Sequence, residues 1–315
     1  MDNKAAITED LELKLFGALA LFIVLFLGIS LIFSFRANRR DVSAPGEVVA
    51  DQFPQVSLEA KAAYVYDLRT GEVLFAKNED KRLPLASLTK VMSALVARDI
   101  SPDYGIVTVG EEALENDGYS GLFRDEKWAL KDLLDFSLIT SSNDGMRAVA
   151  LALGALSRAD ATDDEIINDF VGRMNEKASD LGLKNTYFWN ETGLDQSDIK
   201  GGAYGTAEDV TALMAFIIME FPDLLAATQE SVSEFASLDN NVHVARNTND
   251  IISDIPGLLA SKTGFTDTAG GNLSIIFDPE LGRPIVVTVL GSTEEGRFSD
   301  VRSLVNATLE YLSVK

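Results

Sequence analysis

The chain of 315 residues has 46% hydrophobic residues, enough for a substantial buried core, so its composition excludes a wholly disordered protein. Asp and Glu number 49 against 27 for Lys and Arg, and the net charge of -22 would repel a phosphate backbone, which argues against nucleic acid as a partner. The absence of cysteine excludes thiolate nucleophiles and Cys-bearing zinc sites, and the single histidine, His243, excludes multi-histidine metal centres, so we expect no metal and no cofactor.

The first predicted element is a membrane helix. Residues 15–35 carry no formal charge and are rich in Leu, Phe, Ile and Val. At about 1.5 Å per residue this run would span roughly 31 Å, close to the roughly 30 Å hydrocarbon core of a bilayer. A cleaved signal peptide is the alternative, but its apolar region usually has about 7 to 15 residues. We therefore expect a short tail over residues 1–14 and an uncleaved transmembrane helix over residues 15–35.

The charges around this helix bear on the side of the membrane where the rest of the chain lies. Two lysines precede the helix and three arginines follow it, so the positive-inside rule mildly favours a cytoplasmic domain. Residues 36–58 lack a sustained apolar period and contain turn-forming Pro and Gly, which predicts a flexible linker. The globular domain is then expected over residues 59–315. Because long domains can translocate despite a small charge bias, the chemistry of the domain decides its expected side.

Strands are predicted at both ends of this domain. Residues 62–67 and 72–76 alternate or run apolar around a turn that contains Gly71, and residues 272–277 and 284–290 form a second such pair. Helical apolar spacing marks the segments at 129–139, 143–154, 163–180 and 206–220, followed by a final amphipathic helix over 298–312. This order predicts an α+β fold: a mainly antiparallel sheet with flanking helices and an inserted, mostly helical subdomain.

The strongest local signal for chemistry is Leu85-Ala86-Ser87-Leu88-Thr89-Lys90, which enters an apolar helical pattern. Ser87 and Lys90 lie three residues apart, so on a helix the amine can reach the hydroxyl. The positive end of the helix and partial burial both disfavour ammonium, which makes Lys90 a candidate base for a serine that is otherwise a weak nucleophile. A helix cap is the ordinary alternative for Ser87 alone, and Ser197 to Lys200 repeats the spacing with no apolar helix behind it.

Two further motifs follow in order. Ser141-Ser142-Asn143 lies between helical segments and offers a hydroxyl and an amide for proton relay and substrate binding, although alone it would be interpreted as a helix cap. Lys262-Thr263-Gly264 lies at the start of a predicted strand region. Its Lys and Thr can bind a carboxylate, and its Gly allows close approach of the backbone. The ordered set of three motifs is much more specific than any one of them.

With these motifs the chain resembles the D-alanyl-D-alanine carboxypeptidases, the low-molecular-weight penicillin-binding proteins of the β-lactamase-like fold, over residues 58–312. Other stretches similar to that family are Ala60-Lys61-Ala62-Ala63, Asp67 to Gly71, Arg246-Asn247-Thr248-Asn249 and Thr266-Asp267. The resemblance implies that Ser87 is acylated, that Lys90 is its general base, and that Ser141 with Asn143 completes the proton and substrate network.

The resemblance also implies residues that bind the substrate. Lys262, Thr263 and Gly264 would contribute to the carboxylate side of the site. The backbone amides of Ser87 and Phe265 would form the oxyanion hole.

A cation for the substrate carboxylate is implied as well. Arg297 resembles an arginine that serves this role in the family, although a surface arginine opening the last helix is an equal alternative. Arg246 is a second, weaker candidate. His243 has no motif around it, so we expect a structural or solvent-facing role.

The implied activity is removal of the terminal D-alanine from peptidoglycan stem peptides, with β-lactam antibiotics as covalent inhibitors. Because this substrate lies outside the cytoplasm, we expect the domain on the extracytoplasmic side of the cell membrane, in conflict with the flanking charges.

A β-lactamase would share the motifs, but Glu191-Thr192-Gly193-Leu194-Asp195 does not reproduce its E-x-x-L-N pattern. Two further functions compete with the carboxypeptidase: an endopeptidase acting on cross-links, and a non-catalytic, membrane-tethered wall-binding protein. The intact pair of Ser87 and Lys90 argues against the wall-binding protein.

Overall fold

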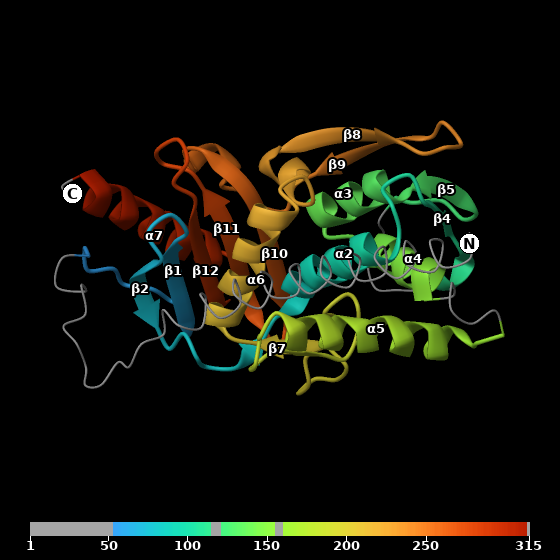
Figure 1. Ribbon diagram of the computed structural model, residues 1–315, viewed down its shortest axis with the longest axis horizontal. Coiled ribbons are helices and arrows are strands. Elements are labelled where there is room, and N and C mark those ends of the chain that lie inside the picture. Colours follow the sequence, from blue (N-terminus) through green and yellow to red (C-terminus); the bar gives the residue numbers. More distant parts are fainter. Residues whose placement is uncertain (1–52, 115–120, 155–159, 314–315) are drawn as a thin grey trace, which may run out of the picture. The chain divides into compact units, whose positions relative to one another are not determined.

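The computed structural model describes residues 53–114, 121–154 and 160–313. Its main sheet has five antiparallel strands drawn from both ends of the domain (Figure 1). Their spatial order is β10 (Leu258–Thr266), β11 (Gly270–Phe277), β12 (Ile285–Ser292), β1 (Ala62–Asp67) and β2 (Glu72–Lys77). Both predicted strand pairs are confirmed. Strand β10 begins at Leu258, so Lys262 lies in the middle of a strand and not at its start.

The two faces of this sheet belong to two separate cores. On β1, Ala62 and Tyr64 pack into one core, whereas Ala63 and Val65 pack into the other, as the alternation of side chains along a strand requires. Helix α6 (Ala207–Glu220) covers the first face, and the last helix, α7 (Gly296–Ser313), covers the second (Figure 1). Every residue of β12 is buried, because helices cover the sheet on both sides.

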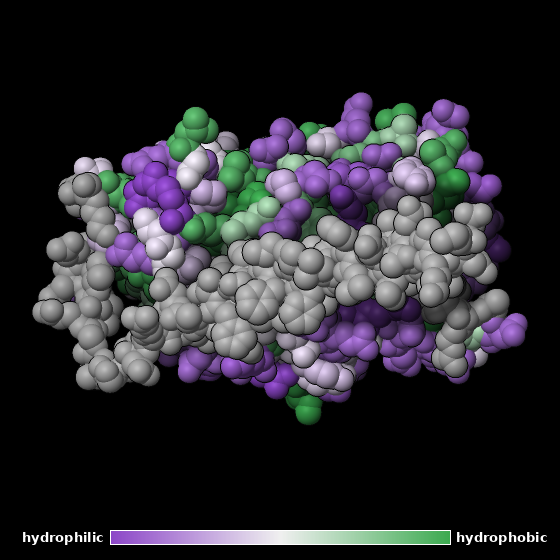
Figure 2. Space-filling view, viewed as in Figure 1, coloured by the Kyte–Doolittle hydropathy of each residue, from purple (hydrophilic) through white to green (hydrophobic). Residues whose placement is uncertain are grey.

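The inserted part is mostly helical, as predicted. Its helices are α2 (Thr89–Ile100), α3 (Leu130–Thr140), α4 (Asn143–Gly154) and α5 (Asp163–Asp180). Helix α2 packs against α4, α5 and α6 and is buried from Thr89 to Ala97. Helix α5 is amphipathic, and Figure 2 shows hydrophilic side chains along the edge of the molecule where α5 runs in Figure 1. The mixed α+β fold with antiparallel sheets is therefore confirmed.

Smaller sheets, which the sequence pattern did not predict, surround the helices. They are formed by β4 (Ile106–Val109) with β5 (Glu126–Ala129), β8 (Val232–Ala236) with β9 (Val242–Arg246), and β3 (Leu83–Pro84), β7 (Ala203–Gly205) and β6 (Tyr187–Phe188) in the order β3-β7-β6. His243 on β9 is 6% exposed, and its Nε2 lies 2.8 Å from Oε1 of Glu126 on β5. Of the two roles expected for His243, this position supports the structural one, because the contact fastens the β8–β9 hairpin to β5.

The folded part includes residues assigned above to the linker. Phe53 is 7% exposed and its ring lies 5.7 Å from the rings of both Phe75 and Tyr311. The packed domain therefore already includes Phe53, six residues before the predicted boundary at residue 59. The predicted transmembrane helix, residues 15–35, lies outside the described residues. Within the described ranges, no helix combines the length and apolar character needed to cross a membrane.

Candidate active site

Ser87 lies in a short 3-10 turn, η2 (Ala86–Leu88), directly before α2. Ala86 has a φ of +48°, a left-handed conformation that is uncommon for a residue with a Cβ. Two neighbouring segments hold the turn. The Leu85 amide donates to the Ala203 carbonyl at 3.0 Å, and Gly193 lies so close that a Cβ there would be 1.9 Å from the Ala86 carbonyl oxygen. The surrounding chain therefore fixes the position of the serine.

Lys90, one turn further along, is completely buried and lies within hydrogen-bond distance of three oxygen atoms. Its Nζ is 2.9 Å from Ser87 Oγ, 2.7 Å from Asn143 Oδ1 and 2.9 Å from the Thr192 carbonyl oxygen. Burial lowers the pKa of Lys90 to about 7, although the negative charge of Glu191 opposes this shift. A neutral amine in this position donates to Asn143 and Thr192 and directs its lone pair at Ser87. Lys90 can therefore accept the serine proton.

A second buried amine, Lys262 on β10, faces Ser141. Ser141 ends α3 with a φ of +59°, and this left-handed turn leads the chain into α4, which begins at Asn143. Lys262 is 1% exposed and its Nζ donates to Ser141 Oγ at 2.9 Å and to the Thr263 carbonyl at 2.8 Å. Its pKa is held well below the usual range by burial first, and then by the positive charges of Lys90 and Arg297. The structure thus brings the three sequence motifs into one site.

Strand β10 lies directly against the turn that carries Ser87. A Cβ on Gly264 would be 2.9 Å from the Leu85 carbonyl oxygen and 3.1 Å from the Ser87 nitrogen, so only glycine fits without a shift. Phe265 follows with a side chain that is 40% exposed. Arg297, in the first turn of α7, is 8% exposed and donates from Nη1 to the Gly264 carbonyl at 3.1 Å. Arg297 therefore belongs to the site and is not a solvated surface arginine.

Thr248 is a site residue whose contact was not predicted. Its Oγ1 lies 2.5 Å from Oγ1 of Thr263, so the segment after β9 supports the K-T-G motif. Arg246 lies two residues earlier, at the end of β9, and is exposed. Within the described residues, no hydrogen bond joins Arg246 to the other predicted site residues. The structure therefore places Arg246 beside the site, where it lines a neighbouring pocket.

The loop from Asn190 to Asp195 also contributes to the site. Its sequence had indicated only that the β-lactamase pattern E-x-x-L-N is absent. Thr192 supplies the carbonyl that binds Lys90, and Gly193 packs on Ala86. Asp195 accepts from Thr266 Oγ1 at 2.9 Å and from the Thr268 amide at 3.0 Å, which ties the loop to the end of β10. These partners are distant in sequence, so no local pattern identifies them.

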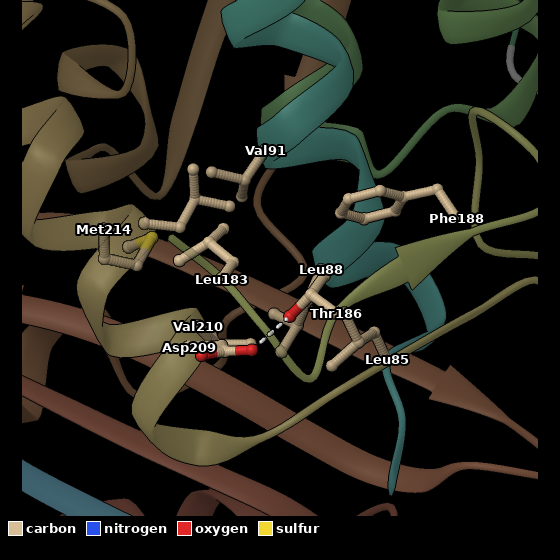
Figure 3. Close-up of a pocket in the computed structure, with 10 residues that line it drawn as sticks. Leu85, Leu88, Val91, Leu183, Thr186, Phe188, Asp209, Val210 and Met214 are labelled. Atoms are coloured by element: carbon tan, nitrogen blue, oxygen red, sulfur yellow. Dashed lines mark hydrogen bonds between the residues drawn. The ribbon is translucent and has the colours of Figure 1, made fainter. Parts of the chain in front are cut away.

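A different cavity lies on the apolar side of α2 (Figure 3). Leu88 and Val91 line it, one residue beyond Ser87 and Lys90 respectively, together with Leu183 and Met214. Its volume of about 10 Å³ is close to that of a single water, so it cannot hold a substrate. Asp209 at its edge accepts from Thr186 Oγ1 at 2.9 Å. The side of α2 that carries Leu88 and Val91 is thus closely packed, and the candidate chemistry lies on an adjacent side.

Comparison with known proteins identifies the family to which the chain belongs. Residues 47–293 match the family described as D-alanyl-D-alanine carboxypeptidase. The chain is 29% identical to D-alanyl-D-alanine carboxypeptidase DacF of Bacillus subtilis over 259 residues, which cover 80% of this chain and 62% of that protein. It is 32% identical to a D-alanyl-D-alanine endopeptidase of Pseudomonas aeruginosa over 222 residues, which cover 69% of this chain and 66% of that protein. The chain therefore spans slightly less than two thirds of these relatives.

Solved structures share the fold. Penicillin-binding protein D2 from Listeria monocytogenes, in its cefotaxime-bound form, is 28% identical with a TM-score of 0.67, and the match covers 81% of this chain and 98% of that one. A Streptomyces K15 DD-transpeptidase mutant is 24% identical with a TM-score of 0.73, and the match covers 81% of this chain and 100% of that one.

Proposed function

We propose that this chain, which belongs to the D-alanyl-D-alanine carboxypeptidase family, is a serine peptidase that removes the terminal D-alanine from peptidoglycan stem peptides. The observation that carries the proposal is the contact of 2.9 Å between Lys90 Nζ and Ser87 Oγ inside a site where Lys90 is fully buried. Burying an amine costs free energy, and a buried neutral amine beside a serine hydroxyl can act as its general base. A protein that only binds the cell wall does not need a buried general base.

In the proposed reaction, Ser87 Oγ attacks the carbonyl carbon of the scissile amide while neutral Lys90 takes the hydroxyl proton. The C–N bond then breaks, and the proton passes to the leaving amine through the hydroxyl of Ser141, which Lys262 holds at 2.9 Å. Free D-alanine departs and an ester on Ser87 remains. Water hydrolyses this ester, which restores the serine hydroxyl and releases the shortened peptide.

Charge and backbone amides would stabilise the substrate and the transition state. Arg297 places positive charge beside β10, and Lys262 and Thr263 add hydrogen-bond donors, so a terminal carboxylate can bind there despite the acidic chain. The backbone amides of Ser87 and Phe265 form the oxyanion hole in this proposal. Losing one such donor typically costs about 10² to 10³ in rate. No step requires a cofactor.

The same groups would react with β-lactam antibiotics, which offer a strained amide beside a carboxylate. Penicillin-binding protein D2 of Listeria monocytogenes has been solved in cefotaxime-bound and ampicillin-bound forms, and its fold matches this chain. We therefore infer that Ser87 is acylated by penicillins and that the adduct persists for minutes. Rapid turnover of penicillin without a persistent adduct would favour a β-lactamase instead.

The mechanism is tested by replacing the nucleophile. Ser87→Ala is expected to lower D-alanine release from diacetyl-lysyl-D-Ala-D-Ala by more than about 10³-fold and to abolish labelling by a fluorescent penicillin. Ser197→Ala is the matched control, because Ser197 has the same spacing to Lys200 but lies in an exposed turn. Its activity should equal that of the parent. Unchanged D-alanine release in Ser87→Ala would eliminate the mechanism.

A second candidate activity is cleavage of cross-linked peptides. Proteins named D-alanyl-D-alanine endopeptidase, from Pseudomonas aeruginosa and Escherichia coli, are among the relatives of this chain. The reaction would differ only in the leaving group. The groups around Ser87 serve either substrate equally well.

For the location of the protein, we propose attachment to the cell membrane through residues 15–35, with the domain on the extracytoplasmic side. Two arguments support this proposal: the length of the uncharged run in the sequence, and the external location of peptidoglycan. The flanking charges argue mildly for the opposite orientation.

A further inference from the structure

A buried ion pair lies next to the site and has no part in the proposed acylation step. Glu191 is 2% exposed, and its Oε1 lies 3.3 Å from Nη1 of Arg147 on α4. Its other carboxylate oxygen, Oε2, is buried and has no hydrogen-bond partner among the described residues. Removing a carboxylate from water costs free energy that one contact of this length offsets poorly, so stability alone does not explain the pair.

The pair joins the two segments that hold Lys90. The Thr192 carbonyl, which accepts from Lys90 at 2.9 Å, belongs to the residue directly after Glu191. Asn143, whose Oδ1 accepts from Lys90 at 2.7 Å, lies four residues before Arg147 on α4, so both side chains project from the same face of that helix. The contact between Glu191 and Arg147 therefore ties together two of the acceptors of Lys90.

Helix α2 holds the backbone of Glu191. Ser93, three residues beyond Lys90 on the same face of α2, donates from Oγ to the Glu191 carbonyl at 2.6 Å. Lys90 and Ser93 thus bind successive carbonyls of the loop. Helices α2 and α4 lie side by side, so the backbone of Glu191 is held by one helix while its side chain contacts the other (Figure 1). The carboxylate therefore has a fixed place relative to Lys90.

From this place the carboxylate acts on the amine electrostatically. Burial lowers the pKa of Lys90 to about 7, and the negative charge of Glu191 opposes a larger fall. The Arg147 side chain is 22% exposed, so water partly screens its positive charge, whereas Glu191 is almost fully enclosed. The carboxylate is thus only partly compensated, and its remaining charge favours the protonated form of Lys90.

Other charged groups surround α2. They are Lys262 on β10 and Arg297 on α7, which face the site, Asp144 on α4, Asp135 with Lys131 on α3, Lys177 of α5 with Asp99 of α2, and Asp209 on α6. The two on β10 and α7 are cationic groups, which disfavour a further positive charge in the site. Among the described residues, Glu191 is the acidic group that raises the pKa of Lys90.

We propose that Glu191 and Arg147 are positioning residues for the general base and that their opposite charges set the pH range in which Ser87 is acylated. The inference rests on the proposed acylation of Ser87 by way of Lys90. The carboxylate keeps the amine strongly basic, and the guanidinium limits this effect so that the amine is still neutral near pH 7. A general base is most effective when its pKa lies near the working pH.

The test removes each charge in turn and measures kcat/KM for D-alanine release from diacetyl-lysyl-D-Ala-D-Ala across pH. Glu191→Gln removes the negative charge, so the midpoint of the acid limb should move lower by about one pH unit, and the plateau rate should fall because the base is weaker. Arg147→Gln leaves the carboxylate uncompensated, so the midpoint should move higher, by less because Arg147 is partly exposed. A purely structural role would lower the rate without moving the midpoint.

Arg302→Gln is the matched control, because Arg302 forms an exposed ion pair with Asp254 at 2.7 Å. It should keep the midpoint and the rate of the parent. The rate of acylation by a fluorescent penicillin should give the same midpoints as D-alanine release in every variant, since both reactions use Lys90. Because Arg147 is the less buried member of the pair, Arg147→Gln decides the question even if Glu191→Gln does not fold.

Two results would overturn this inference: midpoints that stay at the value of the parent, whatever the loss in rate, or midpoints that move in the same direction in both variants. These failures differ from failure of the proposed function, in which the parent itself would release no D-alanine and would not be labelled by penicillin.

Discussion

Two buried amines, Lys90 and Lys262, determine the electrostatics of the site. Each is removed from water, and the positive charge of Lys90 helps to lower the pKa of Lys262. The two also have different partners, Ser87 and Asn143 for one and Ser141 for the other. Separate partners allow separate roles: Lys90 as the base toward the nucleophile, and Lys262 as the support of the hydroxyl that returns the proton.

The pKa of Lys90 predicts how activity depends on pH. Burial lowers this pKa to about 7, and only the neutral amine can accept the serine proton. Protonation below that value removes the base, so kcat/KM for D-alanine release should fall about tenfold per pH unit in acid and level off above neutrality. Steady-state kinetics across pH measure this directly. The rate of penicillin acylation should show the same dependence, since it uses the same base, and a flat profile between about pH 5 and 8 would contradict the role of Lys90.

At the level of the elements, the site depends on close contact between β10 and the turn η2. Gly264 permits this contact, because its missing Cβ would otherwise lie 2.9 Å from the Leu85 carbonyl oxygen. Ala86, next to the serine, already has a left-handed backbone conformation, so the turn cannot easily shift away from β10. A side chain at residue 264 must therefore displace the strand that carries Lys262 and Thr263.

Gly264→Ala is accordingly expected to lower kcat/KM for D-alanine release by about 10²-fold, the loss that follows from a misplacement of about 1 Å in a catalytic site. The protein should still fold, because the new methyl group is small and the contact is confined to one turn. Gly172→Ala is the control: Gly172 lies on α5, and a Cβ there would meet no atom within 4 Å. Thermal unfolding of both variants separates a folding defect from a catalytic one. Full activity in Gly264→Ala would show that β10 need not touch η2.

The long elements could be predicted from the sequence because their periodicity is local. The helical spacing at residues 163–180 coincides with α5, whose apolar side faces the core. The short strands β4, β5, β8 and β9 were missed, because four or five residues give too little pattern to distinguish a strand from a loop. The buried position of Phe53 was also missed, since its aromatic partners Phe75 and Tyr311 come from distant parts of the chain.

The residues of the candidate site also divide into those that the sequence predicted and those that it did not. The ordered motifs predicted that Ser87, Lys90, Asn143 and Lys262 meet, through the family that they resemble. The contributions of Thr192 and Thr248 had no such signal. Thr192 acts through its backbone carbonyl, which any residue type has, and Thr248 acts by contact with another threonine on a separate strand. Neither contact can be derived without the fold.

For the molecule as a whole, the proposed location leads to a test in cells. The full chain should remain in the membrane fraction after a high-salt wash, and protease added to cells without their wall should digest the domain. A variant lacking residues 15–35 should lose this attachment and remain protected inside the cell. Recovery of the full chain in the soluble cytoplasmic fraction would contradict the proposal. A mature N-terminus beyond residue 35 would instead indicate a cleaved signal peptide.

The pairing of β1 with β12 also affects when the proposed active site can form. Ala62 pairs with Leu290, so the central sheet cannot close until nearly the whole domain has left the ribosome. The same late segment brings Lys262 and Arg297 to Ser87. While a nascent chain passes through a secretion channel, Ser87 would therefore lack the site residues that the late segment supplies. If the domain is exported as proposed, the proposed reactivity toward cell-wall peptides and antibiotics would arise only after export is complete.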